Sequence, residues 1–299
     1  MSFYKLSPLS SELGAEVFNF DLISLHDSNG SIPLEFIEQI KRDVKKNRIL
    51  IFRSQKKVIS GQYQVDFSNQ LGKVISNFCK HPKQPHSEVF RLSNDHNEGC
   101  TNVGRSGWHI DGTFQYLTMY FPSVNKTGKT EFVGLKELYE GLTETEKNRW
   151  SRLWMMNLGD KSYPLVYEYD GYETLCFHCG EGVIDGWILE VEDCQSTDFF
   201  DKNGVPTKNI DSFYHGTAIQ KEITDSIENM NYGRSKLKIN WNQGDFAIID
   251  NLAVAHFATA GTQDDVEISG LRILHRTTVM VDGMIPTKKD GRTGFSSPQ

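Results

Sequence analysis

Short apolar runs separated by turn residues fill most of the chain, and this spacing restricts its fold more than any other feature. The runs are rich in β-branched and aromatic residues and end at Gly, Asn or Asp, which is typical of strands. They cover residues 48–52, 88–92, 175–177, 246–249, 253–259 and 271–280. Helical spacing or helix caps are confined to residues 31–44, 60–71, 143–156 and 220–231, where Thr143 and Glu146 also form the pattern of a capping box. We therefore expect a mainly β protein of the α+β class, a β-sandwich or jelly roll with peripheral helices.

The size and charge of the chain narrow its class further. It has 299 residues without an internal repeat or a linker-like stretch, so we expect a single domain over residues 1–299. Its formal net charge of −7 argues against a nucleic-acid partner. The first residues contain no apolar signal segment, no apolar run is long enough for a membrane span, and five sparse cysteines do not form a disulfide framework. We expect a cytoplasmic protein, and the sequence leaves open whether it forms a homo-oligomer.

Two histidine segments stand out among the nine histidines of the chain. His109 and Asp111 are separated by one residue in the segment GWHIDGTF. On a strand, residues i and i+2 project from the same face, so this imidazole and this carboxylate can converge on one metal ion. His256 lies at the end of a second strand-like run, after a turn. Two histidines and one carboxylate form the facial triad of non-haem Fe(II) oxygenases, which leaves open positions on one side of the metal.

Two arginines follow the second histidine segment. Arg272 and Arg276 are four residues apart in a strand-like run, so they share a face with Leu274. Two cations on one strand face of an acidic protein need an anion, although a pair of surface arginines explains the spacing equally well. An arginine downstream of the second histidine can bind a carboxylate through two hydrogen bonds.

Because they occur together and in this order, these segments resemble the taurine dioxygenase / 2,4-dichlorophenoxyacetate dioxygenase (TauD/TfdA) family of Fe(II)- and 2-oxoglutarate-dependent oxygenases. The resemblance covers nearly the whole chain. Residues 13–17 resemble the opening strand of the family, 50–55 its next strand, 67–72 a helix end, and 164–177 its middle strand pair. The resemblance implies a double-stranded β-helix, the cupin-like jelly roll, and an enzyme that uses Fe(II), 2-oxoglutarate and O2.

The resemblance also implies roles for individual residues. His109, Asp111 and His256 match the iron ligands and are the expected catalytic centre. Arg272 and Thr130 match the residues that hold the distal carboxylate of 2-oxoglutarate.

Two departures from the family pattern bear on these assignments. Arg272 follows His256 by 16 residues, which is longer than the family spacing. The additional residues fall in 262–269, which we expect to form an extended loop, and Arg272 keeps its family role only if that loop is an insertion between paired strands. The segment that joins Asp111 to Thr130 also differs by about one residue from that of the taurine enzyme.

The expected substrate is a small anionic metabolite. The family implies substrate contacts by His81, by the backbone at Gly112 and by Arg276, and Arg105 adds a positive charge four residues before His109. The default outcome is hydroxylation of a C–H bond, coupled to decarboxylation of 2-oxoglutarate to succinate and CO2. The alternative is desaturation or oxidative cyclisation of a carboxylate-rich specialised metabolite, such as a kainoid-type precursor. A cluster of Lys80, Lys83 and His86 adds to the positive charge, but it is better explained as a solvated loop.

Alternatives from other classes remain open at this point. Cys176 and Cys179 form half of a zinc-binding pattern, but the sequence has no second C-x-x-C. A non-catalytic jelly roll that only binds a ligand would not need the complete triad with Arg272. A cupin-type enzyme of another reaction, such as an isomerase, would need neither Arg272 nor Thr130.

Overall fold

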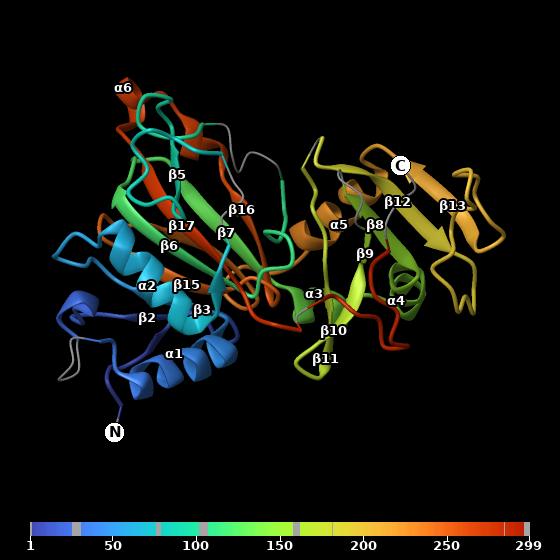
Figure 1. The fold of residues 1–299 in the computed structure, drawn as a ribbon, viewed down its shortest axis with the longest axis horizontal. Helices are drawn as coiled ribbons and strands as arrows, with labels where there is room; N and C mark the ends of the chain where they lie inside the picture. The colour runs from blue at the N-terminus through green and yellow to red at the C-terminus, as the bar shows by residue number, and fades with distance from the viewer. Residues whose placement is uncertain are drawn as a thin grey trace.

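The structure is a computed structural model that describes residues 2–25, 31–75, 79–101, 107–157, 162–180, 182–283 and 285–295. Figure 1 shows two lobes side by side. One lobe holds the N-terminal helices and two facing sheets, and the other is built from the middle of the chain. In the described ranges, no helix has both the length and the apolar character that a membrane span requires.

The large sheet forms the wall of the first lobe. Its strands lie in the order β1 (Ser7–Pro8), β2 (Ala15–Val17), β3 (Ile49–Phe52), β15 (Phe246–Asp250), β6 (Tyr116–Ser123), β17 (Ile273–Met280) and β4 (Lys73–Val74), and β5 (Phe90–Ser93) also pairs with β17. All of these pairs are antiparallel except β2 with β3. Helices α1 (Leu34–Asn47) and α2 (Gly61–Leu71) cover its outer face, where the apolar stripe of α1 packs onto Leu50 and Phe52.

The small sheet faces the inner side of the large one. It consists of β14 (Lys236–Asn240), β7 (Lys129–Gly134) and β16 (Val254–Ala258), all antiparallel. Alternate residues of both sheets point into one shared core, because successive side chains of a strand project to opposite faces. That core includes Ile49, Leu117, Phe121, Phe132, Ile249, Val254 and Leu274. Two facing sheets around one core, with helices outside, confirm the expected jelly roll.

The second lobe is inserted between β7 and β14. It begins with α3 (Leu135–Glu140) and α4 (Glu144–Ser151) and ends with α5 (Ala218–Glu228). Its sheet has the order β13 (Ile210–His215), β12 (Ile184–Glu190), β8 (Leu153–Asn157) and β9 (Ser162–Pro164), and β10 (Val166–Tyr169) and β11 (Tyr172–Leu175) form a separate hairpin. This lobe shares a hydrophobic core with the region around Trp108 and Ile110, so it packs directly beside the histidine segment.

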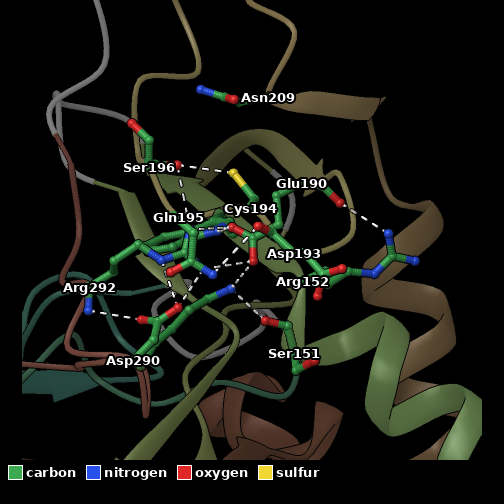
Figure 2. Close-up of polar contacts among 12 residues, drawn as sticks. Ser151, Arg152, Glu190, Asp193, Cys194, Gln195, Ser196, Asn209, Asp290 and Arg292 are labelled. Atoms are coloured by element: carbon green, nitrogen blue, oxygen red, sulfur yellow. Dashed lines mark hydrogen bonds and ion pairs between the residues drawn. The ribbon is translucent and has the colours of Figure 1, made fainter.

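The C-terminal tail crosses to the second lobe and is anchored there by buried charges (Figure 2). The Glu190 carboxylate accepts hydrogen bonds from Lys288 Nζ at 2.7 Å, from both Arg292 Nη atoms at 2.8 and 3.0 Å, and from Trp154 Nε1 at 2.8 Å. A buried carboxylate with this many donors is stabilised, whereas the same group without them would be costly. The tail therefore belongs to the packed structure of the lobe.

Most predicted elements occur, and several boundaries were wrong. The capping box of Thr143 and Glu146 starts α4 as expected, but that helix ends at Ser151 and residues 153–157 form a strand. The strand expected at 175–177 ends at Leu175. The loop expected at 262–269 is wrong as well, because it contains two short helical turns, η2 (Ala260–Gln263) and α6 (Val266–Ser269).

Candidate metal centre

Three histidines lie in a row at the open edge of the small sheet. His109 forms antiparallel bridges with His256 of β16 on one side and with His178 on the other. Its backbone N–H donates to the carbonyl of His256 at 3.1 Å, and the His256 N–H donates back at 2.9 Å. Directly paired residues of antiparallel strands project to the same face, so the three imidazoles are neighbours. The ring centroid of His109 lies 4.4 Å from that of His256 and 4.6 Å from that of His178.

Asp111 completes a compact group with two of these histidines. One ligand atom from each of His109, Asp111 and His256 lies within 4.8 Å of the others. The His109 Nε2 atom is 3.8 Å from Asp111 Oδ1, and the His256 Nε2 atom is 3.6 Å from Asp111 Oδ2. The Nδ1 atom of His109 lies 2.7 Å from the Gly107 carbonyl, which can only accept, so Nδ1 carries the proton and Nε2 presents its lone pair. Within the described ranges, this is the one group of three or more metal-ligating side chains.

The pKa shifts of these three side chains favour the protonation states in which they can bind a metal ion. Burial lowers the pKa of His109, and burial together with the charge of His109 lowers the pKa of His256 to about 3, so both imidazoles are neutral. Burial alone would raise the pKa of Asp111, but the charge of Arg276 and of the nearby histidines outweighs it and lowers the pKa to about 2. Two neutral imidazoles and one carboxylate are a donor set that suits Fe(II).

Arg276 and Asn251 hold Asp111 in place. Arg276 Nη1 donates to Asp111 Oδ2 at 2.6 Å. The Asp111 backbone N–H donates to Asn251 Oδ1 at 2.8 Å, while Asn251 Nδ2 donates to the carbonyls of Asp111 at 3.3 Å and Phe114 at 2.7 Å. Asn251 is completely buried, so these bonds are shielded from water. Arg276, expected to face the substrate, is thus engaged by the carboxylate of the triad.

Arg272 and Thr130 are buried on opposing sides of the jelly-roll interior. Arg272 is 4% exposed and immediately precedes β17. It is two residues before Leu274, which packs in the shared core, so both side chains project from the same face. Among the described residues, Arg272 has no acidic partner. Burial lowers the pKa of its guanidinium to about 10, so it is still charged at neutral pH. Thr130 lies on β7 opposite Ala258, two residues from His256, and its Oγ1 accepts a hydrogen bond from Trp241 Nε1 at 2.9 Å.

The other residues that the sequence predicts to contact the substrate differ in their positions relative to the triad. His81 accepts the N–H of Lys83 at Nδ1 and has its Nε2 3.2 Å from the carbonyl of His96, so both contacts brace its own loop rather than the triad. Lys83 forms an ion pair with Glu98, which removes it from the expected cationic cluster. Gly112 has a φ of +56° and follows Asp111 directly. Arg105 lies outside the described residues.

A cavity of about 250 Å³ opens beside Asp111. The segment from Ile110 to Phe114 forms one wall, and Met155, Tyr163, Phe177 and His178 contribute from the second lobe. A larger cavity of about 460 Å³ lies against α1 and contains none of the triad, so the smaller cavity is the one that the chemistry can use. The cavity volume is near the lower end for ligand pockets, which fits a small metabolite.

Three residues of the site were missed by sequence reasoning. Asn251 could have been noticed, because Asp250 and Asn251 interrupt two apolar strand-like runs. His178 follows a predicted strand directly, but its sequence context between Cys176 and Cys179 indicates only half of a zinc pattern. Burial raises the pKa of both thiols to about 12, which disfavours the thiolates that zinc needs. Trp241 carried no signal in the sequence.

Comparisons with known proteins agree with this fold. The sequence matches no protein-family model and no curated protein sequence. Among solved structures, it is similar to a protein from Burkholderia xenovorans assigned as an alpha-ketoglutarate-dependent taurine dioxygenase, with a TM-score of 0.70 and 20% identity over 98% of this chain and 97% of that chain. It is also similar to a taurine dioxygenase from Burkholderia xenovorans, with a TM-score of 0.69 and 20% identity over 99% and 96% of the two chains.

A third solved structure is similar over comparable lengths. It is AAD-2 in complex with Mn(II) and N-oxalylglycine, with a TM-score of 0.63 and 14% identity over 95% of this chain and 100% of that chain. At these identities the likeness is one of fold. This chain therefore has the fold of the alpha-ketoglutarate-dependent taurine dioxygenases.

Proposed function

We propose that the protein is an Fe(II)- and 2-oxoglutarate-dependent oxygenase that oxidises a C–H bond of a small anionic metabolite, with hydroxylation as the default outcome. The proposal rests on the triad, on the buried arginine beyond it and on the fold shared with enzymes named for alpha-ketoglutarate dependence. All five cysteines are free, which agrees with action in the reducing cytoplasm.

In this proposal, His109, Asp111 and His256 hold the iron. Bound Fe(II) would supply activation of O2, coupled to decarboxylation of 2-oxoglutarate to succinate and CO2. The chain itself keeps His109 in the ligating tautomer through Gly107, and it keeps Asp111 ionised through Arg276. These partners orient the ligands, which typically changes metal affinity 10- to 100-fold.

The observation that carries the 2-oxoglutarate assignment is the unpaired buried charge of Arg272. A buried cation without a partner is strongly unfavourable, so a folded protein retains one where an anion binds. Arg272 immediately precedes β17, four residues before Arg276, which contacts Asp111, so the two backbone positions are about 13 Å apart if the chain is extended there. A dicarboxylate bound at the metal through one end would bring its other carboxylate to Arg272 as the missing anion. Thr130 would add a hydrogen bond from its hydroxyl, because Trp241 occupies only an acceptor position of that oxygen.

Succinate formation tests the proposal directly. Protein purified without oxygen would be supplied with Fe(II), 2-oxoglutarate, ascorbate and O2, and succinate would be measured with and without a panel of small carboxylates that includes N-prenylated amino acids. We expect one panel member to raise succinate sharply in the wild type and in neither His109→Ala nor Arg272→Ala. Binding of 2-oxoglutarate that is equal in the wild type and in Arg272→Ala would contradict the co-substrate assignment.

A further inference from the structure

We propose that His178 is a substrate-binding residue, which donates a hydrogen bond from Nε2–H to an acceptor oxygen on a largely apolar substrate. This inference rests on the proposed function and names the substrate class of the same site. It assigns to the inserted lobe the choice of which molecule is held beside the metal.

The position of His178 is fixed by the row of imidazoles. It pairs with His109 through an antiparallel bridge, and the two rings are stacked at 24° with centroids 4.6 Å apart. His178 nevertheless lies outside the group of His109, Asp111 and His256, whose ligand atoms converge. It lines the cavity beside Asp111 instead. A polar ring is therefore held against a metal ligand while it faces the space that a substrate would occupy.

The hydrogen bonds of His178 determine which ring atom can donate. The backbone N–H of Gly180 donates to His178 Nδ1 at 3.0 Å. A neutral imidazole has one acceptor and one donor nitrogen, so the proton is on Nε2. No described residue accepts a hydrogen bond from Nε2. An N–H that lines a cavity without a protein partner is a ready donor to a bound acceptor.

The rest of the cavity selects for an apolar body. Most of its walls are apolar and include Ile110, Phe114, Met155 and Phe177, while Asp111, Thr113 and Tyr163 add polar groups beside His178. In such surroundings, a misplaced polar group on a ligand loses its water without compensation, so one well-placed donor has a large effect on selectivity. The substrate class is therefore a small molecule with an alkyl or alkenyl body and a carboxylate or carbonyl oxygen that reaches His178.

The alternative role for His178 is purely structural, as a ring that packs on His109. Two substitutions separate these roles. His178→Phe keeps a flat ring for stacking but removes the N–H, whereas His178→Gln keeps an N–H donor near the position of Nε2 but removes the ring. Each variant is first compared with the wild type by its unfolding midpoint in urea and by its Mn(II) affinity.

Binding of three matched probes is then measured by calorimetry, with Mn(II) and N-oxalylglycine bound and again without metal. The probes are 4-methylpentanoate, 4-methylpentanamide and 4-methylpentylammonium, which share one alkyl body and differ in their polar end. We expect the wild type and His178→Gln to favour the two acceptor probes over the ammonium about tenfold, and His178→Phe to lose that preference. The carboxylate and amide arms show which acceptor is preferred.

Three results would overturn the proposal. One is a wild type without preference for either acceptor probe, and another is a His178→Phe variant that keeps the preference. The third is an equal loss in His178→Gln and His178→Phe, or a loss that follows their Mn(II) affinity, because both point to stacking. Failure of the wild type to bind N-oxalylglycine with Mn(II) would instead contradict the proposed function. The metal-free difference in probe preference between His178→Phe and the wild type would still decide the role of His178, because both proteins share the Asp111 charge in the cavity.

Discussion

Arg276 donates a 2.6 Å hydrogen bond to Asp111, although the two residues are 165 positions apart and belong to opposite sides of the site. The guanidinium is nearly completely buried and lies over the ring of Phe90, with 5.2 Å between its central carbon and the ring centroid. A charge-assisted bond in such surroundings is strong and directional. Arg276 therefore orients and ionises Asp111, the carboxylate of the proposed iron site.

Replacing Arg276 should weaken metal binding. In Arg276→Leu, burial would no longer be opposed by the guanidinium charge, so the pKa of Asp111 would rise and its orientation would be lost. We expect a 10- to 100-fold lower affinity for Mn(II), measured by calorimetry at neutral pH. Arg276→Lys, which keeps the charge but not the planar geometry, should fall between the two. An unchanged Mn(II) affinity in Arg276→Leu would show that the arginine serves the substrate alone.

Asn251 should matter for both stability and metal binding. Asn251→Ala removes the acceptor of the Asp111 N–H and the donor to the Phe114 carbonyl, both part-buried, which costs about 1–3 kcal/mol of unfolding free energy. Asn251→Asp keeps the acceptor for the Asp111 N–H but loses both donors. We expect both variants to unfold at lower urea concentration and to bind Mn(II) more weakly. Wild-type Mn(II) affinity in a destabilised Asn251→Ala would mean that Asn251 supports only the fold.

Trp241 should affect the co-substrate rather than the metal. Its Nε1–H donates to Thr130, and its ring stacks on Phe121 with 4.1 Å between centroids. Trp241→Phe keeps an aromatic ring but removes the donor that orients the Thr130 hydroxyl. We expect a several-fold higher Kd for 2-oxoglutarate, similar to that of Thr130→Val, at unchanged Mn(II) affinity. If Trp241→Phe weakens 2-oxoglutarate binding further when added to Thr130→Val, the two residues act independently.

The sequence allowed the fold to be predicted where periodicity was strong. The helices at Leu34–Asn47 and Gly61–Leu71 and the strands that carry His256 and Arg276 appear in patterns of apolar residues. The inserted lobe was largely missed, because short strands such as Ser162–Pro164 carry too few residues for a clear pattern. The two short helical turns within 260–269 were missed for the same reason.

The site could be predicted only in part for a different reason. Residue type and order indicated His109, Asp111 and His256, and the structure brings their ligand atoms together. Contacts between distant segments left no local trace, so the pairing of Arg276 with Asp111 could not be foreseen. The place of His178 beside His109 also depends on tertiary packing, because 69 positions separate the two residues.

Asp250 makes stability depend on pH near neutrality. It ends β15, is buried, and accepts hydrogen bonds from Tyr169 Oη at 2.7 Å and from the Leu252 N–H at 3.2 Å. Burial raises the pKa of Asp250 to about 7, well above its ordinary value of 3.8. Between these two values the folded state keeps a proton that the unfolded state has released. The contribution of Asp250 to stability is therefore greatest at acidic pH and is lost as the pH rises towards 7.

Asp250→Asn tests this dependence, because an amide imitates the protonated carboxyl group and does not titrate. We expect the wild type to lose roughly 2 kcal/mol of unfolding free energy, relative to Asp250→Asn, between pH 5 and pH 7, and to remain level above that. Urea unfolding of both proteins at pH 5, 6, 7 and 8 gives the difference directly, since the other titrating groups are shared. Parallel stability curves over this range would show that Asp250 is already ionised at pH 5, and that its hydrogen bonds with Tyr169 and Leu252 offset its burial.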